Sequence, residues 1–294
     1  ILLFHERENW QHTALIKYDW EKENMLKTAG RERGLDDKEF AYDAALQQIG
    51  LWKNSLLFPS DIRATDTFEE DCLYLYKKYE EMKQRNGKFD FDDMLVGCYR
   101  LFSEQPEILE KYKERFRYIL IDEFQDINKV QYQLIKMLTT KNICVVGDDD
   151  QSIYAFRGSD PSFILNFEYD FPDTWTIKLS QNYRSSHQIV ATANRLIAKN
   201  ERRKEKTMVA QHNEGKAPIM FYPLDEEQEA TMIVTDIAEK IEAGANPSDF
   251  AVLYRTHTMS RAIFERLAMS NLPFTIDSDA ESFYQRRMVR SMLA

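Results

Sequence analysis

The stretch Tyr118-Ile-Leu-Ile-Asp-Glu-Phe-Gln-Asp126 joins a short apolar run to an acidic pair that follows it directly. Four apolar residues in a row suit a strand that is buried on both faces of a parallel sheet. Open parallel sheets bind their ligands at the carboxyl ends of the strands, which is where Asp122 and Glu123 fall. We therefore predict an α/β fold, a parallel sheet with helices on both faces, and a ligand site at this edge.

A second apolar run, residues 143–146, ends in Gly147 and is followed by three aspartates and Gln151. Two neighbouring strands would then deliver polar residues to the same edge of the sheet. An acidic loop behind a core strand explains either segment alone, but it explains the pair poorly. Asp122 suits a magnesium ligand, and Glu123 suits a base that activates water against a γ-phosphate.

Aromatic and cationic side chains alternate directly behind this predicted phosphate site. Tyr154, Phe156 and Arg157 have the composition of a platform on which unpaired bases stack. Because every base has a π-face, such a platform holds single strands without reading their sequence. The alternative is that Tyr154 and Phe156 are core aromatics at the start of a helix.

A third polar segment follows the strand-like residues 176–179. Ser185 and Gln188 have the spacing of a capping box, which predicts that a helix begins there. Arg184 would project from the strand-to-helix turn toward a transferring phosphate, and Tyr183 could stack on a purine. An ordinary surface arginine and a packing tyrosine are the alternative.

Together these segments resemble the superfamily 1 DNA helicases of the UvrD/Rep/PcrA group. The resemblance rests on DEFQDIN (122–128), VGDDDQSIYAFRG (146–158), QNYRSS (181–186), VLYRT (252–256) and the weaker FDFDDML (89–95). It implies RecA-like P-loop NTPase motor domains with an α-helical insertion subdomain. It also implies an ATP-dependent enzyme that moves 3′ to 5′ on single-stranded DNA and unwinds duplexes at junctions.

The resemblance also assigns roles in ATP hydrolysis to individual residues. Asp122 would hold Mg²⁺ and Glu123 would act on the attacking water. Gln151 would sense the γ-phosphate, and Arg184 would contact it from the second motor domain. Tyr183 would stack on the adenine ring.

Four residues would contact DNA by the same resemblance. Tyr154 and Phe156 would stack on bases of single-stranded DNA, and Phe156 stands where many members have tryptophan. Phenylalanine keeps the π-face but has less area and no indole N–H, which predicts a weaker stack. Arg157 would link this contact to the nucleotide site, and Arg255 would lie at a DNA-facing strand end of the second motor domain.

One motif expected of this group is absent from the sequence. There is no G-x-x-x-x-G-K-[ST], which would supply the lysine and the hydroxyl that cradle the phosphates and hold Mg²⁺. Later motifs of the group are missing too, and residues 282–287 resemble the point where its second accessory domain is inserted. We expect the chain to be an internal fragment, inactive alone, whose N- and C-terminal parts belong to the same polypeptide.

Three domains are expected within the 294 residues. Residues 1–86 show apolar stripes at helical spacing, including Trp10, Trp20 and Trp52, and would form the helical insertion. Residues 87–177 would be the C-terminal part of the first RecA-like domain. Residues 178–294 would begin the second, because predicted strands at 219–222, 250–254 and 274–276 alternate with helices at 226–243 and 260–270.

Composition excludes several classes of protein. A formal charge of −10 argues against a uniformly basic nucleic-acid binder, so DNA contacts must be local. Cys72, Cys98 and Cys144 show no pairing motif and suit buried thiols of a reducing cytosol. The sequence has neither an apolar run of membrane-spanning length nor a visible signal peptide, which favours a cytoplasmic protein without membrane contact.

Two other functions compete with the helicase interpretation. A non-catalytic module that binds DNA or a partner would explain the missing phosphate loop, but it gives no reason to keep Asp122, Glu123, Gln151 and Arg184 together. A two-metal nuclease could use the aspartates at 148–150. Consecutive residues rarely all face one metal pair, so the nuclease is the weaker alternative.

Overall fold

A computed structural model of the chain describes residues 14–256 and 258–276. Contacts divide the chain into two compact units, residues 1–212 and 213–294, each of which is described by itself. The predicted domain division between residues 177 and 178 stays a prediction. The predicted apolar position Trp10 and the segment 282–287 lie outside the described residues.

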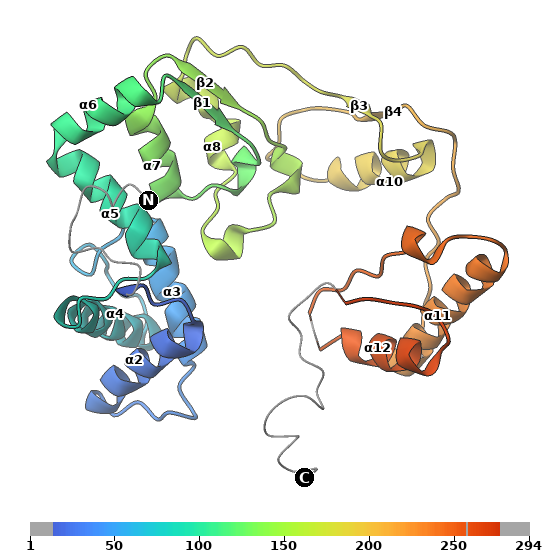
Figure 1. Cartoon of the computed structure of the whole chain (residues 1–294), viewed down its shortest axis with the longest axis horizontal. Helices are drawn as coiled ribbons and strands as arrows, with labels where there is room; N and C mark the ends of the chain where they lie inside the picture. Colours follow the sequence, from blue (N-terminus) through green and yellow to red (C-terminus); the bar gives the residue numbers. More distant parts are fainter. Residues whose placement is uncertain (1–13, 257, 277–294) are drawn as a thin grey trace. The chain divides into compact units, whose positions relative to one another are not determined.

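The first unit begins with a helical region of three helices that pack on one another (Figure 1). These helices are α2 (Asp19–Glu32), α3 (Tyr42–Asn54) and α4 (Thr67–Arg85). Pro59 lies in the connection between α3 and α4, where its missing N–H does no harm to a helix. Asp66 caps α4, because its side chain accepts a hydrogen bond of 2.8 Å from the Glu69 amide.

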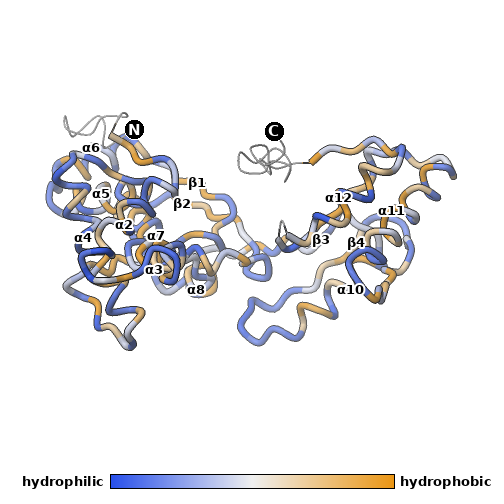
Figure 2. Tube along the Cα trace, turned by 90° about the horizontal axis from the view of Figure 1, so that it is seen from below, coloured by the Kyte–Doolittle hydropathy of each residue, from blue (hydrophilic) through white to orange (hydrophobic). Residues whose placement is uncertain are grey.

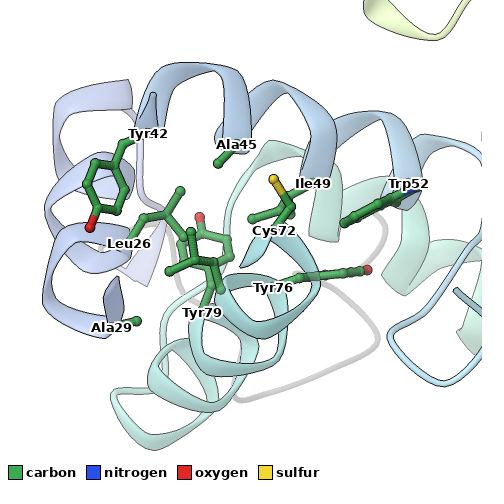
Figure 3. Close-up of a cluster of buried hydrophobic side chains, with 10 residues drawn as sticks. Leu26, Ala29, Tyr42, Ala45, Ile49, Trp52, Cys72, Tyr76 and Tyr79 are labelled. Carbon is green, nitrogen blue, oxygen red and sulfur yellow. The ribbon is translucent and has the colours of Figure 1, made fainter. Parts of the chain in front are cut away.

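The core of this region is made by one apolar face from each of the three helices, as Figure 3 shows. The buried residues are Leu26, Ala29, Tyr42, Ala45, Ile49, Trp52, Cys72, Leu75, Tyr76 and Tyr79. The predicted helical character of this segment is confirmed. The prediction for Trp20 is wrong: its side chain is 62% exposed, because it stacks on exposed Tyr18 instead of facing the core.

Two further helices, α5 (Phe91–Glu104) and α6 (Pro106–Arg115), connect the helical region to the sheet. Asn86 and Gly87 form the turn before α5, and Gly87 adopts a positive φ of 60°. Asp90 and Asp93 form a capping box at the start of α5. Asp90 itself is buried.

A two-stranded parallel sheet follows, formed by β1 (Tyr118–Ile121) and β2 (Asn142–Val145), which run side by side in Figure 1. The register pairs Ile119 with Ile143 and Ile121 with Val145. Ile121, Ile143 and Val145 pack against a core that includes residues of α7 (Lys129–Leu138) and α8 (Ser162–Leu165).

The expectation that this strand is buried on both faces is wrong for the described residues. Tyr118 and Leu120 are 74% and 79% exposed, because the helices cover one face of the sheet only. Cys144 is exposed on β2 for the same reason, whereas Cys72 is buried and Cys98 is half-buried. Burial raises the pKa of the Cys72 thiol to about 12.

The rest of the first unit contains short elements and one longer helix. These are α9 (Phe167–Asp170), β3 (Gln181–Asn182), α10 (His187–Ile197) and β4 (Val209–Ala210), with β3 parallel to β4. The predicted strand at 176–179 does not form, and its apolar side chains are exposed. The predicted capping box is also wrong, because Ser186 is the N-cap and its side chain makes no capping bond.

The second unit is built on α11 (Glu226–Glu242) and α12 (Ser260–Met269), which pack on each other around Ala230, Val234 and Ile263. Both helices fall where the sequence predicts them, and apolar and polar stretches alternate along them in Figure 2. The three predicted strands are absent from the described residues. Their apolar side chains are largely exposed, with Leu253 at 92%, so no neighbour covers them as a strand requires.

Candidate functional site

The carboxyl ends of β1 and β2 lie directly beside each other, as the sequence predicts. The Val146 amide donates a hydrogen bond of 2.8 Å to the Ile121 carbonyl, and the Phe124 amide donates one of 2.9 Å to the Val146 carbonyl. The turn that carries Asp122 and Glu123 is therefore bonded to the end of β2. Both acidic residues are exposed at this edge.

Gly147 allows this close approach. A Cβ atom at this position would lie 3.0 Å from the Phe124 backbone nitrogen and 2.6 Å from the Gln125 side-chain oxygen. A backbone atom cannot move aside as a flexible side chain can, so any larger residue would push the two strand ends apart. The glycine at the end of the second apolar run thus serves packing as well as turning.

Glu123 adopts a left-handed backbone conformation, with φ of 51° and ψ of 42°. This region is uncommon for residues other than glycine and costs about 1 kcal/mol or more. The conformation turns the chain sharply into the 3₁₀ turn η2 (Phe124–Asp126). Residues in such conformations often occur at functional sites, where the surrounding structure holds them.

A buried glutamine joins the turn after β1 to the loop after β2. Gln125 is 1% exposed, and its Nε2 donates a hydrogen bond of 2.7 Å to Oε2 of Glu123. Its Oε1 accepts a hydrogen bond of 3.0 Å from the Asp148 amide. Asp148 Oδ2 in turn accepts a hydrogen bond of 2.8 Å from Nε2 of Gln151. The predicted residues Glu123 and Gln151 are therefore connected through Gln125 and Asp148.

Two cations bind the acidic loop that contains Asp148, Asp149 and Asp150. Arg203 and Lys206 form ion pairs with these carboxylates. Partial burial opposes the charge on Lys206, but its bonds to the aspartates raise its pKa to about 12. Burial would raise the pKa of Asp150, yet the two cations lower it.

The aromatic segment that follows is open to solvent. Tyr154 is 37% exposed and Phe156 is 59% exposed, so the alternative that both are core residues is wrong. Their ring centroids lie 6.0 Å apart with planes inclined by 49°. The Arg157 guanidinium carbon lies 5.2 Å from the Tyr154 centroid and 5.5 Å from that of Phe156. Because a flat ring with an accessible face can stack on a base, this geometry suits single-strand binding.

Tyr183 and Arg184 lie in a separate turn behind β3. Asn182 holds this turn, because its side-chain oxygen accepts hydrogen bonds from the amides of Arg184, at 3.0 Å, and Ser185, at 2.8 Å. The side chains of Tyr183 and Arg184 are exposed. In the described residues, the hydrogen bonds of Tyr183 and Arg184 go to Gln181, Asn182 and His212, and none of them reaches Glu123. Arg255 is exposed in the second unit.

The residues at the strand ends fit a magnesium ion held jointly by protein and phosphate. Among residues 14–256 and 258–276, no group of three or more His, Cys, Asp or Glu side chains could hold a metal by itself. Mg²⁺ usually keeps several waters and takes only one or two carboxylates beside substrate phosphates. The exposed Asp122, with Oδ1 accepting a hydrogen bond from the Glu123 amide, can supply one such carboxylate.

Sequence reasoning missed three residues of this network: Gln125, Arg203 and Lys206. Gln125 lies inside a recognised motif, but only its burial reveals that it connects two loops. Residues 201–206 form a loop of mixed charge. The three consecutive aspartates indicated that cations lie near them, because like charges repel one another unless opposite charges offset them. The sequence did not indicate which cations those are.

In the part of the chain that the structure describes, no helix has both the length and the apolar character needed to cross a membrane.

Two family models match the chain in succession. The UvrD/REP helicase N-terminal domain matches residues 3–172, and the UvrD-like helicase C-terminal domain matches residues 177–294. YjcD of Bacillus subtilis (strain 168), named as an ATP-dependent DNA helicase, is 52% identical over 296 residues. The ATP-dependent DNA helicase PcrA of Staphylococcus aureus (strain Mu50) is 37% identical over 278 residues.

These alignments cover 100% of the chain for YjcD and 93% for PcrA, but only 39% and 38% of the length of those relatives. The resemblance inferred from the motifs is thereby confirmed. Since one family model covers most of the first unit and the other continues to the last residue, the chain belongs to the UvrD/REP helicase family.

Proposed function

We propose that this chain is part of an ATP-dependent DNA helicase that couples ATP hydrolysis to movement on single-stranded DNA. One observation carries the proposal. The two parallel strands end side by side, and Glu123 and Gln151 are joined there through buried Gln125. An exposed aromatic segment begins at Tyr154, only three residues after Gln151. Nucleotide chemistry and base stacking would therefore meet at one edge of the sheet.

The strand ends can divide the work of hydrolysis between them. The Glu123 carboxylate would take a proton from the attacking water, and the Gln125 amide bond would hold Oε2 of that carboxylate in place. Asp122 would hold Mg²⁺, and Gln151 would face the γ-phosphate. When bound, Mg²⁺ supplies neutralisation of phosphate charge. Arg184 would approach the phosphate, and Tyr183 would stack on the adenine.

The DNA contacts would come from the segment after Gln151. Tyr154 and Phe156 would stack on separate bases, since their planes are inclined and not parallel. Arg157, which lies over both rings, would add its charge near the DNA backbone. Arg255 would contribute from the second unit. Single-stranded DNA and its junctions with duplex are the partners that this arrangement supports.

The family supports a finer proposal for the fold and the setting. Residues 87–177 would belong to a first RecA-like domain of the P-loop NTPase type, residues 178–294 to a second, and residues 1–86 to a helical insertion. Movement would run 3′ to 5′, and the protein would work in the cytoplasm. The phosphate-binding lysine would have to come from outside this sequence, since the chain has no such loop.

The test is the substitution Glu123→Gln in the natural gene product that contains this sequence. Loss of a positioned base should lower DNA-stimulated ATP turnover about 10²- to 10⁴-fold. Binding of single-stranded DNA should remain, because the aromatic segment is untouched. Glu114→Gln is a matched control, since Glu114 is an exposed acid of α6.

Turnover near that of the wild type in Glu123→Gln would contradict the assignment of the base. Failure of the unaltered protein to hydrolyse ATP, with DNA binding retained, would instead favour the non-catalytic binding module.

A further inference from the structure

The acidic loop after β2 is bound by a basic segment more than fifty residues further along the chain, and the proposed mechanism does not use this contact. Arg203 binds Asp150 with two hydrogen bonds, from Nε at 2.8 Å and from Nη2 at 2.7 Å. Lys206 Nζ lies 3.0 Å from Asp148, 2.6 Å from Asp149 and 2.9 Å from Asp150. Two cations thus offset most of the negative charge of three consecutive aspartates.

This contact is withdrawn from solvent. The side chains of Asp149 and Asp150 are 6% and 9% exposed, and those of Arg203 and Lys206 are 13% and 17% exposed. Exposed ion pairs hold little in place, but a partly buried network with bidentate geometry fixes the groups that it joins. The Lys204 amide adds a backbone bond of 2.8 Å to Asp149.

The network continues from the cations to the predicted base. Asp148 accepts from both Lys206 and Gln151, and its amide binds the buried side chain of Gln125. Gln125 then donates to the Glu123 carboxylate. A chain of direct hydrogen bonds and ion pairs therefore runs from the basic segment to Glu123.

We propose that Arg203 and Lys206 are positioning residues that fix the loop 148–150 and, through it, the orientation of Gln151 and the Glu123 carboxylate. They act through other side chains and do not touch the reacting atoms. The inference rests on the proposed ATP hydrolysis. It adds that turnover depends on where segment 201–206 lies, because withdrawal of the two cations would release the loop.

The first test measures ATP turnover of Arg203→Ala and Lys206→Ala in the natural gene product that contains this sequence. Misplacement of catalytic groups should lower kcat about tenfold to a hundredfold, while the KM for ATP changes less. Arg202→Ala is the matched control, because Arg202 is exposed and the described structure records no ion pair for it. Unchanged kcat in both variants would overturn the inference.

A charge exchange separates positioning from direct contact with phosphate. The double variant Arg203→Asp with Asp150→Arg restores opposite charges at the same place, so it should recover part of the kcat that Arg203→Asp alone loses. If Arg203 instead bound a phosphate, an aspartate at this position would repel it. The double variant would then recover none of the lost kcat. This result would exclude the positioning role of Arg203.

Amide hydrogen exchange tests the contact without any reliance on turnover. In Lys206→Ala, amides of the segment 147–151 should exchange faster than in the wild type, because the loop loses its anchor. Amides of α3, which belong to the helical region, should not change. Unchanged exchange in the loop would contradict the inference even in an active enzyme. An inactive wild type would instead remove the proposed function, and with it the positioning role of both cations in ATP turnover.

Discussion

Two clusters of charge in the first unit differ in how far they are closed to solvent. At the junction of α3, α4 and α5, Lys53, Lys83 and Asp90 are each 2% exposed. At the ends of β1 and β2, Asp122 and Glu123 are exposed. Both clusters are rich in carboxylates, so composition alone does not distinguish them.

The buried cluster is closed because its groups satisfy one another. Lys53 Nζ lies 2.9 Å from Asp90 and 2.6 Å from Asp93, and Lys83 Nζ lies 3.1 Å from Asp90. Burial would raise the pKa of Asp90, but the two lysines hold it far below its usual range. Burial would likewise lower the pKa of Lys53, yet the aspartates hold it well above its usual range. Asp90 and Lys53 are thus held as ions by partners within the fold.

The carboxylates of the sheet-edge cluster are open to solvent and can still accept bonds from a ligand. The Glu123 carboxylate accepts a hydrogen bond from Gln125. The backbone of Glu123 is in the left-handed conformation. Asp122 Oδ1 accepts a hydrogen bond from the Glu123 amide, and within the described ranges no bond to its Oδ2 is present. Accessible and incompletely bonded carboxylates at a strand end, more than acidic composition, therefore mark the functional candidate.

The largest effect on stability should follow from opening the closed cluster. Asp90→Ala removes the cap of α5 and leaves Lys53 and Lys83 short of a buried partner. Breaking a buried ion pair from one side costs about 3–5 kcal/mol, because the remaining charge is uncompensated. Native-state hydrogen exchange of amides in α3 and α4 would measure the lowered free energy of opening.

Lys240→Ala serves as the control for that experiment. Lys240 pairs with Asp236 on the surface of α11, and both side chains are well exposed. An exposed helix pair is worth about 0.3–0.5 kcal/mol. An effect of Asp90→Ala as small as that would mean that the buried cluster contributes no more to stability than an exposed ion pair.

A second prediction concerns the exposed aromatic segment that follows the sheet edge. Phe156→Ala should weaken binding of single-stranded DNA, since loss of one stacked base costs about 1–3 kcal/mol. Exposed Phe156 is not part of the core, so hydrogen exchange in α3 and α4 should stay unchanged. Phe156→Trp should bind as tightly as the wild type or more tightly, because the indole offers more area. Fluorescence anisotropy with a labelled oligonucleotide distinguishes these outcomes.

If Phe156→Ala weakened DNA binding no more than Trp175→Ala, a stacking role for Phe156 would be excluded. Trp175 is a suitable control because it is 92% exposed in the loop behind α9 and lies outside the aromatic segment.

Local patterns in the sequence predicted most of what the structure contains near the site. The bounds of β1, its parallel pairing with β2, and helices α11 and α12 follow from apolar runs, turn residues and helical periodicity. The acids at 122 and 123 could be placed because the end of an apolar run fixes where the next side chains emerge.

Long-range contacts could not be predicted in this way. Arg203 and Lys206 are too far from the aspartates in sequence for any local pattern to pair them. The strands at 219–222, 250–254 and 274–276 were predicted from apolar character, but a strand also needs a neighbour with which to pair. The sequence did not indicate that Asp90 is buried, because its partners, Lys53 and Lys83, belong to other helices.

The smallest effect is expected beside the closed cluster, at Asp92. Burial and then repulsion by Asp90 raise the pKa of this carboxyl, although Asn54 donates a hydrogen bond of 3.1 Å to it. A raised folded-state pKa means that ionised Asp92 destabilises the folded protein at neutral pH. This destabilisation is relieved as the pH falls through the raised pKa.

Asp92→Asn should therefore leave stability at neutral pH unchanged or slightly higher, because an amide oxygen can still accept from Asn54. The gain over the wild type should shrink as the pH falls, since the wild-type carboxyl then becomes neutral as well. Hydrogen exchange in α5, corrected for the intrinsic effect of pH, measures this, with exposed Asp173→Asn as the control. A loss of stability at neutral pH would show that the cluster needs a charge at Asp92 and would extend the closed network beyond Asp90 and Asp93.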